Sequence, residues 1–280
     1  GVHRRQRQMC IRDRYKVMKE DFTDFIEVSG LLEYDPDTIS KIYQKNPKRL
    51  LKRLWQTLIP IFAYIFSVGW DKLTGRLKNE AKARFRAKEL TNLLVELGPA
   101  FVKAGQALST RPDIIPAILL EELSELQDQL PGFDGDKAME LIEEDLGSKI
   151  DEIFLEIDKE PISAASLGQV HKAKLKNEEV VAVKVQRPGL REQITLDLYI
   201  VRNIAYWLKN NIGLIRSDLV ALIDELGKRV FEEMDYLNEA ENAEKFRNMH
   251  KHNQMIAVPK IYKEITCLLY TSPSPRDRIA

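Results

Sequence analysis

The chain has 280 residues, no formal net charge at neutral pH and a hydrophobic content of 44%. This length allows one large domain or two smaller ones, and the hydrophobic content is ample for a packed core. The even charge balance gives no support to a nucleic-acid-binding function.

The two ends of the chain read as foreign sequence. Residues 4–14, RRQRQMCIRDR, and 267–277, CLLYTSPSPRD, lack helical and strand periodicity, and both back-translate to transposon-end adapters used in sequencing libraries. We therefore expect 1–14 and 267–280 to be translated adapter, and such sequence is excluded from fold reasoning. The alternative is a basic N-terminal arm with a Ser/Pro-rich tail.

Excluding the two ends changes the cysteine content and the net charge of the remaining chain. Both cysteines, Cys10 and Cys267, lie in the excluded ends, so residues 15–266 offer neither a disulfide framework nor a cysteine-based metal site. The ends also carry seven arginines and two aspartates, and without them the net charge is −5. On this interpretation the native sequence breaks off near Thr266, within a domain.

An apolar and aromatic segment stands out in the first part of the chain. Short helices with a basic end are expected over 36–53, and residues 54–70, LWQTLIPIFAYIFSVGW, follow. A spanning helix needs about 17–25 apolar residues, so this run is at the lower limit, and Pro60 weakens it further. A helix at a membrane surface and a helix buried in a larger assembly remain equal alternatives, ahead of a membrane span.

More helices are expected before residue 150. Apolar residues at helical spacing, separated by proline and glycine stops, predict them over 71–98, 100–110, 117–130 and 134–147.

The pattern becomes β-rich after residue 150. Residues 169–175 and 180–186 alternate and are rich in β-branched side chains, which predicts a hairpin. We then expect a helix over 190–210, one long helix over 217–251, and one or two strands over 256–266. The order of helices, strands, helices and strands favours an α+β fold.

Lys184 is the first candidate functional residue. It lies in VVAVKVQR, where alternation places it with Ala182 and Gln186 on the face opposite three valines. A lysine in such an apolar strand needs an anion, which in a kinase N-lobe is the phosphate group of ATP, with a helix glutamate as its partner. A surface lysine on a solvated strand face is the alternative, and this short pattern does not decide between them.

The segment FEEMDYLNEAEN is the second candidate. It carries five carboxylates within three helical turns, at Glu232, Glu233, Asp235, Glu239 and Glu241. A continuous helix would place Glu232, Asp235 and Glu239 on one face. Such a cluster is usually a solvated face, and it gains a function only if it faces Lys184.

The segment FVKAGQALSTRPDIIP is the third. Lys103 and Gln106 fall one turn apart on a short helix, and Gly105 permits close backbone approach. Taken alone, this pattern indicates no particular chemistry.

Together, four motifs in this order resemble the UbiB-type atypical kinases, also called coenzyme Q kinase-like proteins. The motifs are KAGQ at 103–106, AASLGQVH at 164–171, VAVKVQRPG at 181–189, and EMDY at 233–236 followed by EA and N at 239, 240 and 242. The resemblance covers about residues 36–266. The segments DKLTGR and ALSTRPDIIP are most similar to cyanobacterial or plastid-type members.

The resemblance implies a particular architecture. A protein-kinase-like N-lobe at 150–266 would follow an N-terminal helical extension at 15–149, and the C-lobe would be missing. In the family, the Lys-x-Gly-Gln helix of the extension folds over the active site and blocks the groove for a protein substrate. Lys103, Gly105 and Gln106 match that motif.

The resemblance also implies an alanine-rich loop in place of a glycine-rich one. In the family this loop tunes nucleotide preference and self-phosphorylation, and Ala164, Ala165, Ser166 and Gly168 match it. Ser163 stands where many members have another alanine. Alanine still lets the loop close, with less backbone freedom than glycine.

The remaining site residues follow in the same way. Lys184 matches the nucleotide lysine, Glu233 and Asp235 match the Glu-x-Asp motif, and Glu239 is expected to form the ion pair with Lys184. The implied cofactors are ATP and Mg²⁺, with the metal ligands in the missing C-lobe. These four residues are the expected catalytic set.

Some residues are expected to lack a role, and some motifs do not occur. His171 is expected to be a packed or surface strand histidine without a catalytic role, and Arg187 and Arg191 to be solvated. No His-x-Asp and no Asp-Phe-Gly occurs in the chain. We therefore expect the catalytic loop and the metal-binding aspartate beyond residue 266, and this chain by itself to be inactive.

The implied function is ATP binding with ATPase-like activity that supports ubiquinone, plastoquinone or other isoprenoid-lipid biosynthesis at a membrane. The implied partners are a nucleotide, a membrane surface or isoprenoid lipid, and quinone-biosynthesis proteins, but not nucleic acid. The implied location is the cytoplasmic side of a bacterial membrane, or the thylakoid or plastid. The alternatives are a non-catalytic, pseudokinase-type scaffold or membrane-docking protein, and an unrelated helical interaction protein.

Overall fold

A computed structural model describes residues 28, 31–45, 47–113, 115–127, 130–211, 218–253 and 255–266. The chain divides into two compact units. We call them the helical unit, from residues 1–130 and 191–230, and the sheet unit, from residues 131–190 and 231–280. The two ends expected to be adapter lie outside the described residues, so that hypothesis stays a prediction.

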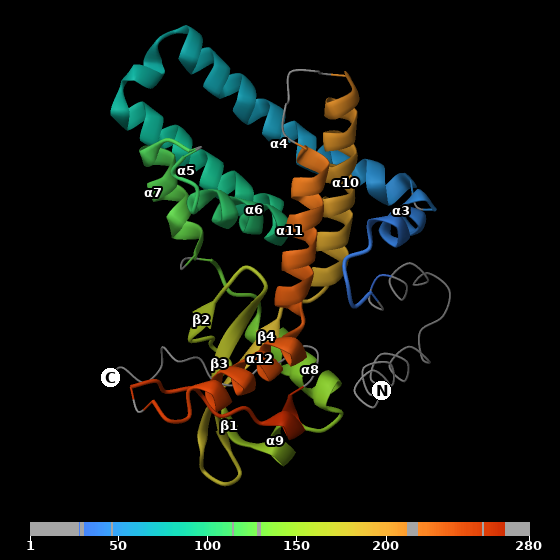
Figure 1. Ribbon diagram of the computed structural model, residues 1–280, viewed down its shortest axis with the longest axis vertical. Coiled ribbons are helices and arrows are strands. Elements are labelled where there is room, and N and C mark those ends of the chain that lie inside the picture. The colour runs from blue at the N-terminus through green and yellow to red at the C-terminus, as the bar shows by residue number, and fades with distance from the viewer. Residues whose placement is uncertain are drawn as a thin grey trace. The chain divides into compact units, whose positions relative to one another are not determined.

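The helical unit is built from helices (Figure 1), and two of them begin at side chains that cap their first turn. Asp35 and Asn79 accept hydrogen bonds from backbone N–H groups as N-caps of α3 and α5. The elements are α3 (Pro36–Gln44), α4 (Pro47–Leu73), η2 (Arg76–Lys78), α5 (Glu80–Leu97), α6 (Pro99–Ser109), α7 (Ala117–Ser124), η3 (Glu125–Gln127) and most of α10 (Leu190–Asn211) and α11 (Leu219–Met234).

Helices α5, α6 and α7 pack together around Val102, Leu123 and Leu126. Helix α4 is held to α10 by a buried ion pair, in which Arg53 Nε lies 2.7 Å from Asp197 Oδ1. Burial raises the pKa of the Asp197 carboxyl, although the Arg53 guanidinium opposes the shift. The pair therefore fixes one end of α4 within the helical unit.

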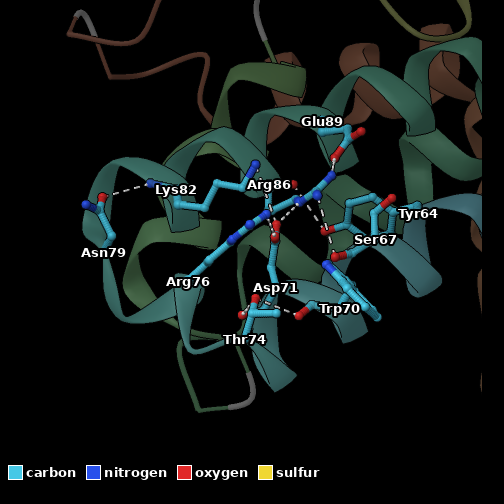
Figure 2. Close-up of polar contacts among 10 residues, drawn as sticks. All are labelled: Tyr64, Ser67, Trp70, Asp71, Thr74, Arg76, Asn79, Lys82, Arg86 and Glu89. Atoms are coloured by element: carbon cyan, nitrogen blue, oxygen red, sulfur yellow. Dashed lines mark hydrogen bonds and ion pairs between the residues drawn. The ribbon is translucent and has the colours of Figure 1, made fainter.

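A second buried carboxylate fixes the other end of α4 (Figure 2). Asp71 Oδ2 lies 2.7 Å from Arg86 Nε and 3.5 Å from Lys82 Nζ, both on α5. Arg76, on η2, lies 4.0 Å from the other oxygen. The helix expected over 71–98 is confirmed over most of its length by α5, but it is not continuous, because Gly75, at φ +72°, turns the chain between α4 and α5.

The sheet unit contains one small antiparallel sheet. Strand β3 is central, with β4 along one edge and β1 and β2 at the two ends of the other. The elements are α8 (Gly135–Leu146), α9 (Ile150–Ile153), β1 (Phe154–Ile157), β2 (Ser163–Ala164), β3 (Gly168–Leu175), β4 (Val180–Gln186), α12 (Tyr236–Met249) and η4 (Lys263–Ile265). Helices and one small sheet together confirm the expected α+β class.

The core of the sheet unit lies between α8 and one face of the sheet. Met139 and Ile142 of α8 pack with Phe154 and with the three valines of β4, at 181, 183 and 185. The expected alternation along β4 is thus confirmed. Helix α8 comes before residue 150, where the β-rich pattern begins, and it nevertheless belongs to the core of the sheet unit.

The strands expected over 256–266 are wrong. Residues 255–262 form no sheet pairing, and Pro259 has no N–H to donate to a ladder. Tyr262 and Ile265 instead pack against the core of the sheet unit.

Candidate functional site

The β3–β4 hairpin places Lys184 on the sheet. The two strands pair in register, with Val170 opposite Lys184, and Glu178 at φ +68° makes the turn. Because Val183 and Val185 point into the core, Lys184 points to the opposite face.

Lys184 forms an ion pair with Glu239 of α12. Its Nζ lies 2.7 Å from Oε2 and 3.0 Å from Oε1 of that carboxylate. Both side chains are partly open to solvent, at 30% and 49% exposure. A pair this exposed contributes at most about 1 kcal/mol to stability. The main effect of the pair is to hold the Lys184 ammonium in one place. An ammonium group held at an accessible surface can bind an anion.

A buried tyrosine lies beneath the ammonium group. Lys184 Nζ is 4.3 Å from the centre of the Tyr236 ring, within cation–π range. Tyr236 is fully buried, and its hydroxyl has no hydrogen-bond partner among the described residues. Burial, followed by the charges of Glu239 and Glu233, raises the pKa of its phenol. The ring and Glu239 therefore fix the ammonium from two directions.

The chain breaks between α11 and α12 at Asp235. The Asp235 side chain accepts a hydrogen bond of 3.0 Å from the backbone N–H of Asn238 and so caps α12. The expected single helix over 217–251 is therefore wrong, and so is the shared face of Glu232, Asp235 and Glu239.

Because of the break, the expected acidic residues lie in three different places. Glu233 is exposed near the end of α11, Asp235 is the cap, and Glu239 lies in the first turn of α12. A carboxylate is favourable in a first turn because the helix dipole is positive there. The structure brings Glu239 to Lys184, and the catalytic roles assigned to Glu233 and Asp235 stay predictions.

The alanine-rich loop closes on itself. The Ala165 N–H donates to the Gly168 carbonyl at 2.7 Å, Ala164 pairs with Gln169, and Ser166 is buried. A Cβ at Gly168 would collide with the Val185 carbonyl and would lie 2.8 Å from the Tyr236 hydroxyl. Gly168 is therefore where the loop meets both the lysine strand and Tyr236.

Arg187 holds this loop through hydrogen bonds that no pattern in the sequence indicated. Its Nη2 donates to the carbonyls of Ala165 at 3.0 Å and Pro131 at 2.5 Å, and burial lowers the pKa of its guanidinium. The expectation of a solvated side chain is wrong here. It is also wrong for Arg191, which donates to the Leu31 carbonyl within the helical unit.

His171 is a packed strand histidine, as expected. Its Nδ1 lies 2.8 Å from the Asp158 carbonyl oxygen and its Nε2 lies 3.0 Å from Gln169 Nε2. Burial lowers the pKa of the imidazole. These contacts account for the residue without a catalytic role.

The Lys-x-Gly-Gln residues lie on α6 of the helical unit. Gly105 is buried, and a Cβ there would come within 2.6 Å of Leu126 and 2.8 Å of Leu94. Gln106 Nε2 donates to the Leu126 carbonyl at 2.8 Å. Gly105 and Gln106 thus pack α6 against α5 and η3. Roles for Lys103, Gly105 and Gln106 at a nucleotide site stay predictions.

The described residues contain no group of three or more His, Cys, Asp or Glu side chains able to hold a metal ion. The Lys184 ammonium fits the phosphate groups of a nucleotide in charge and accessibility.

The ABC1 atypical kinase-like domain matches residues 125–268, more than half of the chain. The chain belongs to this family. The ABC1 match includes the alanine-rich loop, Lys184 and Glu239, and it confirms the resemblance to UbiB-type atypical kinases.

Relatives at high identity support a cyanobacterial or plastid-type ABC1 protein. An uncharacterized protein of Synechocystis sp. is 50% identical over 84% of this chain and 34% of its own length. An aarF domain-containing protein kinase of Arabidopsis thaliana, described as chloroplastic, is 49% identical over 85% of this chain and 34% of its own. The chloroplastic ACTIVITY OF BC1 COMPLEX KINASE 3 of Arabidopsis is 41% identical, over 83% of this chain and 33% of its own length.

One solved structure is also similar, a Mycobacterium tuberculosis protein in a complex titled Rv3197-erythromycin. It is 30% identical over 72% of this chain and 50% of its own length, with a TM-score of 0.45. The chain spans about a third of the length of the relatives named above.

Proposed function

We propose that this chain carries the nucleotide-binding lysine of an ABC1 atypical kinase or ATPase. The observation that carries the proposal is the Lys184–Glu239 ion pair, held on a buried tyrosine beside the alanine-rich loop. In kinase-like sites a strand lysine paired with a helix glutamate binds the α- and β-phosphates of ATP.

This chain's own residues would have distinct tasks. Lys184 would bind the phosphate oxygens of ATP, and Glu239 would orient the ammonium group. Arg187 would hold Ala165 so that the loop keeps its closed form. Mg²⁺ would neutralise phosphate charge when bound, with ligands from outside the described residues.

We further propose that the whole protein uses ATP to support isoprenoid-lipid biosynthesis, such as that of ubiquinone or plastoquinone, at a membrane. Its partners would be the bilayer or an isoprenoid lipid, and quinone-biosynthesis proteins. The chloroplastic relatives support a thylakoid or plastid-type location, or its bacterial counterpart. The ABC1 match supports an ATP-dependent enzyme over a non-catalytic scaffold.

The test measures stabilisation by Mg-ATP in a thermal shift assay. It uses this chain and the full-length Synechocystis relative, each with and without the lysine corresponding to Lys184. We expect Lys184→Ala to abolish the stabilisation. Lys176→Ala is the control, since Lys176 is exposed at the hairpin turn. Equal stabilisation of the wild-type and Lys184→Ala proteins would refute the nucleotide assignment.

A further inference from the structure

The outer face of α4 carries a continuous apolar stripe. We call it the α4 stripe, and its members are each more than half exposed: Leu51, Trp55, Ile59, Phe62, Phe66, Trp70 and Leu73. It runs for about 33 Å at 1.5 Å per residue. Exposed apolar patches of this kind mark interaction sites.

The α4 stripe lies away from the core of the helical unit. The packed face of α4 contains Thr57 and Asp71, both buried. Ile59 and Leu73 each follow one of these residues by two positions, which is about 200° around a helix. The stripe is therefore a second face and not the edge of the packed one.

The charges along α4 favour an anionic partner. Asp71 is the only carboxylate between residues 47 and 78, and it is buried against Arg86. Exposed lysines lie at both ends of the stripe, Lys48 and Lys52 at its start and Lys72 and Lys78 at its end. A second copy of α4 on the stripe, in either direction, would therefore bring lysine next to lysine.

The spacing of the stripe also argues against a coiled coil. Its members follow steps of four, four and three residues, twice in succession. That eleven-residue period gives 3.67 residues per turn, whereas a left-handed coiled coil needs 3.5. A stripe of this period stays nearly straight along the helix and suits a flat surface.

We propose that the α4 stripe docks on an anionic lipid bilayer, with α4 lying in the plane of the surface. Tryptophans near both ends of the stripe are typical of the membrane interface, and the lysines match acidic headgroups. Among the described helices, none has the length and hydropathy needed to cross a membrane. The inference names the surface for the membrane partner of the proposed function, and it does not depend on nucleotide binding.

Flotation with phospholipid vesicles tests the proposal on the 280-residue chain. We expect the chain to float with phosphatidylglycerol-rich vesicles. The variant Ile59→Glu with Phe66→Glu should lower the partition coefficient by about tenfold or more. Leu222→Glu with Met249→Glu is the matched control, because both residues are exposed and lie outside the stripe. Its partition coefficient should stay within about twofold of wild type.

A second pair of measurements separates charge from apolar contact. Replacing Lys52 and Lys72 with Gln should weaken binding to phosphatidylglycerol vesicles by about tenfold or more, and leave binding to phosphatidylcholine vesicles unchanged. In a Trp207→Phe background, the remaining tryptophans, Trp55 and Trp70, both belong to the stripe. Lipids with brominated chains should quench their fluorescence.

The outcomes are distinct. Equal flotation of the wild-type chain and the stripe variant, or no quenching of the two tryptophans, would overturn the proposal. So would a dimer, measured by light scattering, that dissociates in the stripe variant, because a second copy would then cover the stripe. Loss of Mg-ATP stabilisation in Lys184→Ala would leave flotation unaffected, so this proposal and the nucleotide assignment can fail separately.

Discussion

At the scale of single residues, the ring of Tyr236 sets the position of the Lys184 ammonium. Tyr236→Leu removes the cation–π contact and leaves a cavity in a fully buried site. We expect the free energy of unfolding to fall by about 2–4 kcal/mol, together with the affinity for Mg-ATP. Urea unfolding curves and isothermal titration calorimetry measure the two effects.

Tyr236→Phe is the matched variant. It keeps the ring and deletes a hydroxyl that has no hydrogen-bond partner among the described residues. We expect a change of less than about 1 kcal/mol in stability and an unchanged affinity for Mg-ATP. Equal losses in the Phe and Leu variants would show that the hydroxyl, and not the ring, supports Lys184.

The sequence predicted some of these residues and missed others for a physical reason. Strand alternation placed Lys184 on the face opposite the valines and the four motifs together assigned its role, while Glu239 was chosen for its position on the expected helix; all of these signals are local. Tyr236 and Arg187 act through contacts with residues distant in sequence, such as the Arg187 bond to the Pro131 carbonyl. Such contacts exist only once the sheet unit has folded, so no local pattern could indicate them.

At the scale of elements, Gly105 controls how closely α6 packs on its neighbours. In Gly105→Ala the new Cβ would press against Leu94 and Leu126. We expect a loss of about 1–3 kcal/mol in unfolding free energy, measured by urea denaturation. Gly69→Ala, in α4, is the control because nothing lies within 4 Å of its Cβ position. This change should stabilise the chain by up to about 1 kcal/mol. A neutral Gly105→Ala would contradict the packing account.

The break between α11 and α12 gives a further prediction. Asp235→Ala removes the side chain that caps α12, and Asp235→Asn keeps an oxygen acceptor at the same place. We expect the alanine variant to lose about 0.5–2 kcal/mol of unfolding free energy and the asparagine variant much less. Thermal and urea unfolding monitored by circular dichroism measure both. Equal losses would show that the charge of Asp235, and not its cap, matters.

The same break shows where sequence patterns stop being informative. No glycine or proline lies within seven residues of Asp235 on either side, so the periodicity predicted one helix. The backbone at Asp235, at φ −88° and ψ 84°, leaves the helical region, and only the structure shows this. The hairpin, by contrast, was predictable because alternation and a polar turn are both local signals.

At the scale of the whole molecule, the stability of the chain should depend on pH through His171. Burial lowers the pKa of this imidazole in the folded protein. Below the ordinary histidine pKa of about 6.5, the unfolded chain takes up a proton that the folded chain resists. The free energy of unfolding should therefore fall as pH decreases through this window. Urea unfolding between about pH 7.5 and 5 measures the effect.

His171→Gln is the comparison for this prediction, since glutamine stays neutral at every pH. The difference in unfolding free energy between the wild type and this variant should shrink as the pH decreases. A difference that is constant, or that grows toward acidic pH, would contradict the buried neutral imidazole.

The proposed function of the whole molecule requires Lys184 to lie beside the phosphates of a bound nucleotide. An acyl-phosphate derivative of ATP transfers its acyl group to a lysine amine next to the phosphates, and peptide mass spectrometry identifies the modified residue. We predict that Lys184 is acylated, that Mg-ATP competes with the labelling, and that Glu239→Gln weakens it. Labelling spread over exposed lysines such as Lys176, insensitive to Mg-ATP and absent from Lys184, would contradict the claim.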